Sequence, residues 1–438
     1  MSNSDPHQMS RRILGVRARV KLTKDGEARP TQVCIVEGKS NKQRMLTLTT
    51  DQDELDFIVG KFPAEWRDVK PDEDLSEIPV RHLKFKPVPL DVELSTINGT
   101  HLNTVGKQTH QAIKVASKFD GLQPGDTVVI GLGFGDELAY ALARRGDTFD
   151  VPATVQRVPP IVLHDHRVAL KLEDPEVNKD QDAQLLTELW QNNPELFYQV
   201  SNRDEQIIQL RLKYKQVEEA QKARIACEQR LIKRLRTEMY LQDPELYPEG
   251  SLEDSFLSAK ANDTILQGLV KEENKRKSEM EKILKSLDVY SQVFSPIDGC
   301  GPAIAARLIS GIQDVRRFST NHKLKAYCGV HVRKGGKYAD VPENKQFPRR
   351  RGGETSNWND ACRKALYLLV DQANKRPDSY WGKKLRENKV RWSALHPDAS
   401  KMHVQKTAIW KTASQMVNYI FSEWKKLETG QKASSASA

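Results

Sequence analysis

The residues best suited to chemistry lie in a basic, glycine-rich stretch of the carboxy-terminal third. Its cations are Arg333, Lys334, Lys337, Arg349, Arg350 and Arg351, interleaved with Tyr338, Phe347 and Trp358. Cations attract phosphates and aromatic rings stack on bases, so this combination is typical of nucleic-acid binding. The alternative interpretation is a solvated charged face. From Val315 to Lys364 the chain has thirteen Lys or Arg against four Asp or Glu, and Arg316, Arg317 and Arg363 join the predicted binding residues.

A Gly-Cys-Gly-Pro turn lies just before this stretch. Gly299 and Gly301 allow close approach of the backbone, and Pro302 suits the first turn of a helix. The free N–H groups at such a helix start can bind a phosphate, so we predict a phosphate-binding turn here. Packing of Ala305, Ala306, Leu308 and Ile309 against a neighbouring helix explains the same pattern without a ligand.

The amino-terminal elements that would position these groups have the pattern of a mixed α/β domain. Residues 11–62 predict three strands and a helix, rich in β-branched residues and separated by turns. The stretch from Pro63 to Val105 is rich in proline and predicts an insertion or small irregular subdomain. A helix at 110–119, a buried strand with a glycine turn at 124–135, a helix closed by Gly146 and a strand candidate within 147–158 follow. This alternation predicts a parallel layer.

The chain is predicted to be helical from Asp182 onward. Ile207, Leu210, Tyr214 and Val217 recur at helical spacing, as do Met280, Ile283, Leu287 and Tyr290. These repeats predict a long antiparallel hairpin, either an arm with a role in dimerisation or a bundle packed on the core. We expect domains at 1–200, 201–294 and 295–427, followed by a disordered tail at 428–438.

Composition narrows the classes of protein. The 438 residues carry a net charge of +10, which favours a polyanionic partner. The five cysteines are scattered without metal-ligand spacing, so neither disulfides nor structural zinc is expected. No apolar run is long enough to span a membrane, and the polar start lacks the apolar core of a signal peptide. We expect a cytoplasmic, nucleoid-associated protein with no membrane partner.

From Ser295 to Ala373 the chain resembles the carboxy-terminal domain of the DEDD insertion-sequence transposases, the family that includes the Piv DNA invertase. That family has a Gly-x-Gly-Pro helix, an acidic residue with Arg-Phe, a Leu-x-x-Tyr-x-Gly segment, a Ser-Gly and an Asn-x-x-Leu-Arg helix. The matching residues are Gly299, Gly301, Pro302, Ala305, Leu308, Asp314, Arg317, Phe318, Leu324, Ala326, Tyr327, Gly329, Asn359, Arg363, Ala365 and Leu366.

The resemblance implies a fold and a function. It implies an RNase H-like (RuvC-like) α/β amino-terminal domain and a helical transposase domain, to which the helical repeats add a coiled-coil arm and the Gly-Cys-Gly-Pro turn adds a helix-hairpin-helix-like element. It also implies DNA transposition and site-specific recombination with binding of DNA and a structured RNA, and the arm predicts a homo-oligomer, a dimer or tetramer. Four carboxylates resembling a two-metal site would hold Mg²⁺ in an active member, because magnesium prefers hard oxygen ligands.

The catalytic positions depart from that pattern. The family's last carboxylate segment matches at Asp182, with Asp180 beside it, so these two are the candidate catalytic residues. The other family positions hold Arg17 and Gly131 in place of the first two carboxylates, Lys179 in place of the third, and Gly335 in place of the serine. A strand-end arginine would repel a metal ion. We therefore expect a transposase-family nucleic-acid-binding protein with altered catalytic positions.

Two alternatives stay open. Asp91 as the first carboxylate, with Asp136 or Glu137 replacing the missing Glu, and Ser356 as the nucleophile, would give an active transposase. Alternatively, the Gly-x-Gly-x-Gly turn at 131–135 with Asp150 beyond it imitates a dinucleotide-binding oxidoreductase, although the spacing differs from Gly-x-Gly-x-x-Gly.

Overall fold

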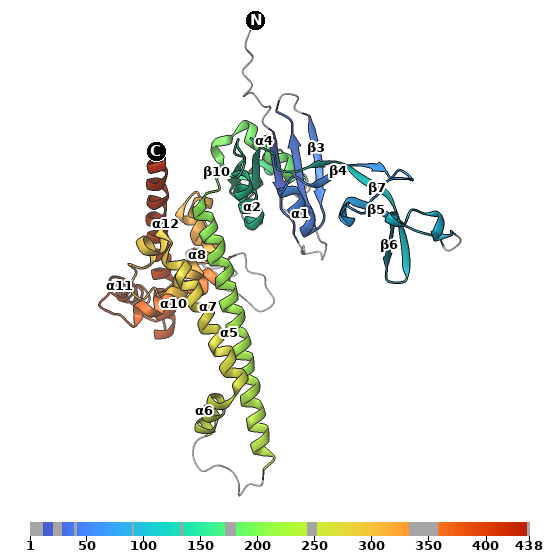
Figure 1. Cartoon of the computed structure of the whole chain (residues 1–438). Coiled ribbons are helices and arrows are strands. Elements are labelled where there is room, and N and C mark those ends of the chain that lie inside the picture. Colours follow the sequence, from blue (N-terminus) through green and yellow to red (C-terminus); the bar gives the residue numbers. More distant parts are fainter. Residues whose placement is uncertain are drawn as a thin grey trace. The chain divides into compact units, whose positions relative to one another are not determined.

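The chain forms two compact units, residues Met1–Ser201 and Asn202–Ala438. The computed structural model describes residues 12–20, 29–38, 42–89, 92–131, 135–170, 181–242, 252–332 and 358–435. The first unit is mixed α/β and the second is helical (Figure 1). Each unit has its own hydrophobic core, so each is described separately.

A six-stranded sheet organises the first unit, in the order β10-β9-β8-β1-β2-β3. Its strands are β1 (Ile13–Arg17), β2 (Thr31–Val36), β3 (Gln43–Leu48), β8 (Thr127–Gly131), β9 (Thr154–Val158) and β10 (Tyr198–Gln199). The first three strands pair antiparallel, whereas β1 with β8 and β8 with β9 pair parallel. The strands predicted within 11–62 and the parallel layer are confirmed.

Helices accompany this sheet. They are α1 (Asp51–Ile58), α2 (Asp136–Gly146), α3 (Pro160–Ala169) and α4 (Asp182–Asn192), with a short 3₁₀ turn at Pro194–Leu196. Three further 3₁₀ turns, at Val80–His82, Leu94–Thr96 and Gly99–His101, lie between the strands of the second sheet described below. Helix α4 packs tightly on β1. A Cβ added at Gly15 would lie 1.9 Å from the carbonyl oxygen of Ala183, so only glycine permits this approach.

The segment expected to be irregular forms a second sheet. Its strands are β4 (Phe62–Asp68), β5 (Leu83–Pro87), β6 (Leu102–Val105) and β7 (Gln108–Asp120), ordered β4-β7-β5 with β6 also paired to β7. The helix predicted at 110–119 is wrong, because these residues belong to β7. The buried residues Ala112 and Val115 are three apart, which imitates a helix. A register shift opposite Lys84 and Phe85 places both of them on one face of the strand.

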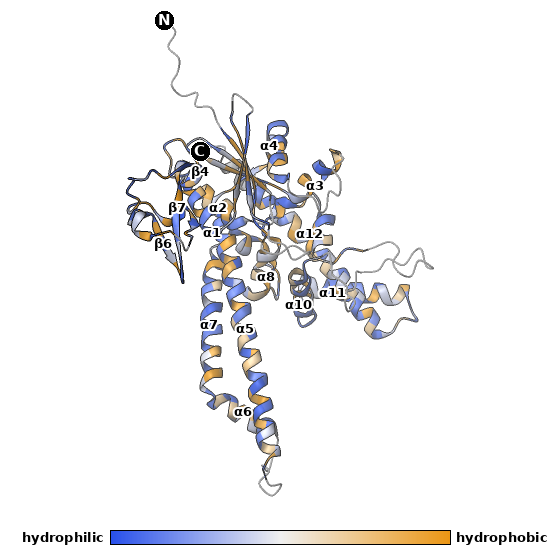
Figure 2. Cartoon of the chain, turned by 90° about the vertical axis from the view of Figure 1, so that its right-hand side faces the viewer, coloured by the Kyte–Doolittle hydropathy of each residue, from blue (hydrophilic) through white to orange (hydrophobic). Residues whose placement is uncertain are grey.

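A long helical hairpin begins the second unit. Helices α5 (Asn202–Tyr240) and α7 (Thr264–Lys285) lie side by side, and α6 (Leu252–Asn262) lies between them in the chain (Figures 1 and 2). The apolar residues predicted to line the hairpin near its base, such as Leu210, Tyr214 and Met280, belong to the same core as the carboxy-terminal helices. The hairpin is therefore an arm whose base is packed into a bundle, which combines the two predicted arrangements.

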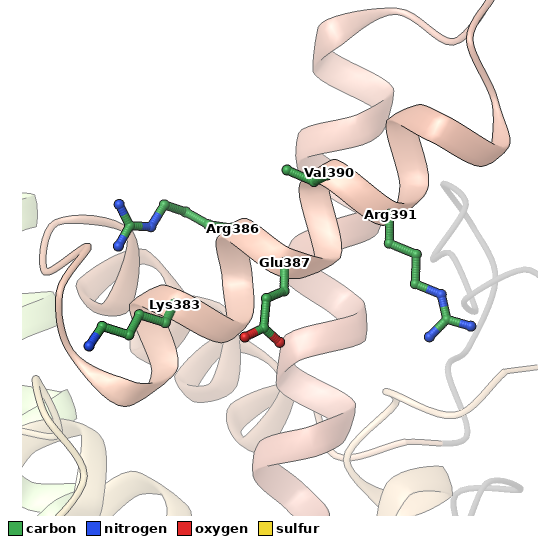
Figure 3. Close-up of a pocket in the computed structure, with 5 residues that line it drawn as sticks. All are labelled: Lys383, Arg386, Glu387, Val390 and Arg391. Carbon is green, nitrogen blue, oxygen red and sulfur yellow. The ribbon is translucent and has the colours of Figure 1, made fainter.

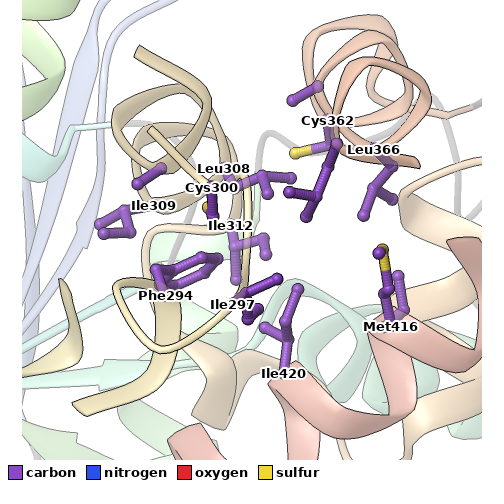
Figure 4. Close-up of a cluster of buried hydrophobic side chains, with 14 of the residues drawn as sticks. Phe294, Ile297, Cys300, Leu308, Ile309, Ile312, Cys362, Leu366, Met416 and Ile420 are labelled. Carbon is purple, nitrogen blue, oxygen red and sulfur yellow. The ribbon is translucent and has the colours of Figure 1, made fainter. Parts of the chain in front are cut away.

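The remaining helices complete this core. They are a π-helix (Tyr290–Phe294), α8 (Pro302–Ile312), a 3₁₀ turn (Val315–Arg317), α9 (Asn321–Tyr327), α10 (Asp360–Asn374), α11 (Tyr380–Leu395) and α12 (Lys401–Ser435). Phe294, Leu308, Cys362, Met416 and Ile420 meet at its centre (Figure 4).

The predicted disordered tail requires a correction. Helix α12 continues past residue 427 to Ser435, and Glu428 within it accepts a hydrogen bond from the Trp424 indole at 2.9 Å. In the part of the chain that is described, no helix is long and apolar enough to cross a membrane.

Candidate functional site

The carboxyl ends of β1 and β8 form the place where the resemblance puts catalytic carboxylates. Arg17 is the last residue of β1 and Gly131 the last of β8, and their preceding residues, Val16 and Ile130, are register partners. Arg17 is buried, and its guanidinium donates a 2.7 Å hydrogen bond to the carbonyl oxygen of Pro30. This edge of the sheet thus presents a cation beside a residue that has no side chain.

Asp182, the best match to a family carboxylate, opens α4 next to Ala183, the residue packed on β1. It is buried, and its Oδ1 lies 3.1 Å from Nε of Arg167, a buried residue in the last turn of α3. This ion pair places a positive charge directly beside the carboxylate in a buried setting. Asp182 is therefore already balanced by a protein cation.

Asp136, the substitute considered for the missing Glu, has a similar environment. It lies in the first turn of α2 and forms an ion pair with Arg157 on β9, and both side chains are buried. Arg157 is the register partner of Ile130, one residue before Gly131. A second carboxylate near the sheet end is thus matched with its own arginine.

These donors do not fit a two-metal site. Magnesium requires several oxygen ligands that point at one position, whereas β1 ends in a guanidinium, β8 ends in a glycine, and the carboxylates of Asp136 and Asp182 are each paired with an arginine. Within the described ranges, no group of three or more His, Cys, Asp or Glu side chains is arranged to hold a metal ion.

Several predicted residues lie outside the described residues. In the amino-terminal unit these are Asp91, Lys179 and Asp180. In the carboxy-terminal unit they are Gly335, Ser356 and the six cations of the basic segment, Arg333, Lys334, Lys337, Arg349, Arg350 and Arg351.

The predicted phosphate-binding turn separates into two glycines with different environments. Gly299 has a φ of 84°, and a Cβ there would lie 2.7 Å from Cβ of Gln372 on α10, so this glycine permits close packing. Gly301 caps α8 without a side-chain hydrogen bond, is exposed and has nothing within 4 Å of an added Cβ. Open space for a ligand therefore exists at Gly301.

Arg316 belongs to a buried ionic cluster. Its Nη2 lies 2.8 Å from Asp314 Oδ2, and Nη2 of Arg203 lies 3.1 Å from the same oxygen. Arg203 also pairs with Glu428 of α12. Burial opposes ionisation of Asp314, but the two arginines outweigh it and hold its pKa below the ordinary value. The cluster joins α5, the turn at 314–317 and α12, which gives Arg316 a structural role.

Arg363 is placed between aromatic rings. Its guanidinium carbon lies 4.9 Å from the ring centre of Trp358 and 4.4 Å from that of Trp410. Its Nη1 donates to the carbonyl oxygen of Gly329 at 2.7 Å. Arg317 is likewise stacked, at 5.2 Å from Phe318 and 4.9 Å from Tyr327. Both arginines stabilise the fold through cation–π contacts.

Other residues of the family motif bind one another. The Tyr327 hydroxyl donates to the carbonyl oxygen of Gly311 at 2.8 Å and accepts from Asn359 Nδ2 at 2.9 Å. The Asn359 N–H donates to the carbonyl oxygen of Tyr327 at 2.7 Å, and its Oδ1 caps α10. Together with Arg363, these bonds hold residues 327–329 against residues 358–363. The basic segment begins and ends beside these held residues in sequence.

Sequence reasoning missed the partners of these groups. Arg157 pairs with Asp136 and Arg167 pairs with Asp182. No sequence spacing indicates these pairs, because the two members of each pair come from separate elements that meet by packing. It also missed a basic stripe on α11, which has a signal: Lys383, Arg386 and Arg391 recur on one helical face.

Comparison with known families supports the predicted resemblance. Residues 291–335 match the sequence model of the family described as Transposase IS116/IS110/IS902 family. The match includes the Gly299–Pro302 turn, Asp314 and Tyr327, whose contacts are given above. No curated protein matches the chain. The resemblance to insertion-sequence transposases of this type is confirmed over this segment.

Proposed function

Starting from a chain that carries a domain of the IS116/IS110/IS902 transposase family, we propose that it binds DNA and a structured RNA without metal-dependent strand cleavage at the family's carboxylate positions. The observation that carries this proposal is the pair Arg17 and Gly131 at adjacent strand ends. Electrostatics makes a buried guanidinium there incompatible with a nearby divalent cation. Strand cleavage and exchange of the kind that the family resemblance implies would then need a separate enzyme.

The arrangement of the main sheet supports common ancestry with the RNase H-like domain of the family. Three antiparallel strands are followed by parallel β8 and β9, and α4 crosses β1 through the Gly15 contact. Asp182 is the first residue of α4, in keeping with the family segment that opens a helix, and α4 packs against the first strand. We therefore propose that the chain keeps the sheet and helix arrangement of the family and has lost most of its metal-binding carboxylates.

Charge supports the nucleic-acid part of the proposal. The chain has an excess of ten positive charges, and the basic segment at 333–351 follows the matched family segment. Counterion release from a polyanion favours binding by such a segment without any base-specific contact.

The active alternative makes a different prediction at the same residues. An active transposase with shifted ligands requires Asp136 and Asp182 to release their arginines and converge on a metal ion. Breaking two buried ion pairs opposes this rearrangement by several kcal/mol, on the order of 3–5 for each pair. An oxidoreductase would instead bind NAD at the turn after β8, and NAD-dependent thermal stabilisation would support it.

A cleavage assay distinguishes a nucleic-acid-binding protein without cleavage activity from an active transposase with shifted metal ligands. Nucleic acid that co-purifies with the full chain is sequenced, and labelled DNA and RNA of that sequence are incubated with the protein and Mg²⁺. We expect binding without strand breaks or strand exchange. Cleavage that needs Mg²⁺, disappears in Asp182→Asn and persists in the exposed control Asp378→Asn would contradict the proposal. If no nucleic acid co-purifies with the protein and none of the added DNA or RNA binds to it, the proposal that the chain binds nucleic acid is contradicted.

We further propose self-association through the arm. Apolar side chains near its far end are strongly exposed: Tyr240, Leu241, Leu257 and Ile265. Such a group is typical of an interface. Light scattering should show a dimer or tetramer that dissociates in Leu257→Lys combined with Ile265→Lys, while exposed Val390→Lys on α11 leaves the mass unchanged. A monomeric parent protein would contradict this proposal.

A further inference from the structure

Helix α11 carries an exposed stripe that the proposed function does not use. Lys383, Arg386, Glu387, Val390 and Arg391 follow one another at three- and four-residue spacing and are all exposed. They line a hollow of about 560 Å³ along the helix (Figure 3). The opposite side of α11 is buried through Trp381, Leu385 and Asn388. The stripe is thus the solvent face of a firmly packed helix.

Charge on this face is strongly one-sided. From Tyr380 to Lys411 the chain has eight Lys or Arg and two Asp or Glu. Glu387, the one acidic residue of the stripe, accepts a 2.9 Å hydrogen bond from Lys384 on the same helix, so its charge is locally offset. Among the described residues, no ion pair within 4.0 Å is found for Lys383 or Arg391. These two cations remain available to a ligand.

The remaining cation of the stripe is partly fixed. Arg386 donates to the carbonyl oxygen of Pro377 at 2.6 Å and lies 3.5 Å from the largely exposed Asp378. A guanidinium has five N–H donors, so these contacts leave others for a phosphate oxygen. Its orientation is set before a ligand arrives.

We infer that this face of α11 binds the phosphate backbone of a nucleic-acid duplex, as a second contact besides the basic segment at 333–351. The inference rests on the proposed function, because it assumes that the chain binds nucleic acid. From Lys383 to Arg391 a helix rises about 12 Å, a length over which duplex DNA carries roughly seven phosphate charges. Three cations on a rigid helix match such a row of anions.

The composition of the stripe indicates contact with the phosphate backbone of a nucleic acid and no recognition of its bases. Its residues are lysine, arginine, one offset glutamate and an aliphatic Val390, which is 71% exposed. No asparagine or glutamine, the side chains that pair with adenine edges, lies among the five described residues of the stripe. Phosphate contacts fix position and orientation on a duplex and carry no sequence information.

The test compares two triple variants of the full chain. Lys383→Gln, Arg386→Gln and Arg391→Gln together remove the charge of the stripe and keep residues that favour helix. The control, Lys271→Gln, Lys275→Gln and Lys282→Gln, removes equal charge from exposed positions of α7. Binding to labelled DNA and RNA duplexes is measured by anisotropy across salt concentrations. Thermal unfolding checks that both variants are folded.

We expect the slope of log affinity against log salt to fall by about 2 to 3 in the α11 variant and to change little in the control. The charge-retaining variant Lys383→Arg, Arg386→Lys and Arg391→Lys should keep the parent slope. The inference is overturned if the α11 variant keeps the parent slope or if the control loses as much slope as the α11 variant. A parent protein that binds no nucleic acid overturns the proposed function itself.

Discussion

The amino-terminal unit contains buried arginines and the carboxy-terminal unit contains partly buried ones, but the two units use them differently. In the first unit, Arg157 and Arg167 each pair with one carboxylate. In the second unit, Arg363 binds a backbone carbonyl and two indole rings, and Arg316 shares Asp314 with Arg203. The first arrangement balances buried carboxylates one by one, whereas the second joins separate segments of the fold.

This difference shows what a match to a motif reports. Tyr327, Asn359 and Arg363 are needed to join backbone segments, so the fold alone demands them whether or not the chain cleaves DNA. Arg17, which stands where the resemblance puts a carboxylate, makes a structural contact to Pro30 at the end of β1. The motif in the second unit is therefore evidence of fold and ancestry, and catalysis must be judged at the sheet end.

Removal of Asp314 should have the largest effect on stability. Asp314→Ala removes a buried carboxylate and leaves the partly buried Arg203 and Arg316 without their shared partner, so we expect the free energy of unfolding to fall by about 3–5 kcal/mol. Urea denaturation of the full chain measures this. The control Asp371→Ala removes an exposed pair with Lys375 and should cost roughly 0.3–0.5 kcal/mol. Equal losses would mean that the cluster is not a distinct stabilising element.

A methyl group at Gly15 should have the next largest effect. In Gly15→Ala the new Cβ meets the carbonyl oxygen of Ala183, so β1 and α4 must separate, and we expect a loss of about 3 kcal/mol. Gly131→Ala is the matched control, since its nearest neighbour would be Leu163 Cδ2 at 4.0 Å. Thermal unfolding followed by circular dichroism compares the two variants. A tolerated Gly15→Ala would contradict the close packing of α4 on β1.

Sequence reasoning succeeded where local pattern and structure agree. The strands within 11–62, the helix ending at Gly146 and the apolar repeat of the hairpin follow from periodicity and turn residues. It failed at β7, where a bulge shifts the alternation of buried residues, and at 428–435, where a polar sequence continues a helix.

The candidate site divides in the same way. Arg17 and Gly131 could be identified from the sequence through the resemblance, because the family's first two carboxylates fall at these positions of the predicted strands. The pairs Asp136–Arg157 and Asp182–Arg167 could not, because separate elements meet only through tertiary packing. Arg316, Arg317 and Arg363 were predicted from charge alone, and charge does not distinguish a buried stacked arginine from an exposed one.

Loss of one hydroxyl in the transposase segment should have a moderate effect. Tyr327→Phe leaves the Gly311 carbonyl and the Asn359 amide without this partner, and we expect about 1–2 kcal/mol of destabilisation. Tyr367→Phe, at a side chain that is 43% exposed, is the control and should change stability little. Hydrogen exchange should also increase in α10 if the contact holds its start. Unchanged exchange would show that Asn359 is fixed by other bonds.

Acid should reveal a smaller contribution of the same ionic cluster. The pKa of Asp314 is lowered in the folded chain because Arg203 and Arg316 outweigh its burial, whereas an unfolded aspartate titrates near about 3.9. Its contribution is therefore complete above that pH and is lost as the pH falls through the folded pKa. Asp314→Asn removes this titration, so its unfolding free energy should decline less steeply than that of the parent below about pH 4. Urea titrations at several pH values measure the two slopes, and parallel slopes would show that Asp314 is not stabilised in its ionised form. The effect is the smallest of the four because one carboxylate titrates among the many acidic groups of the chain.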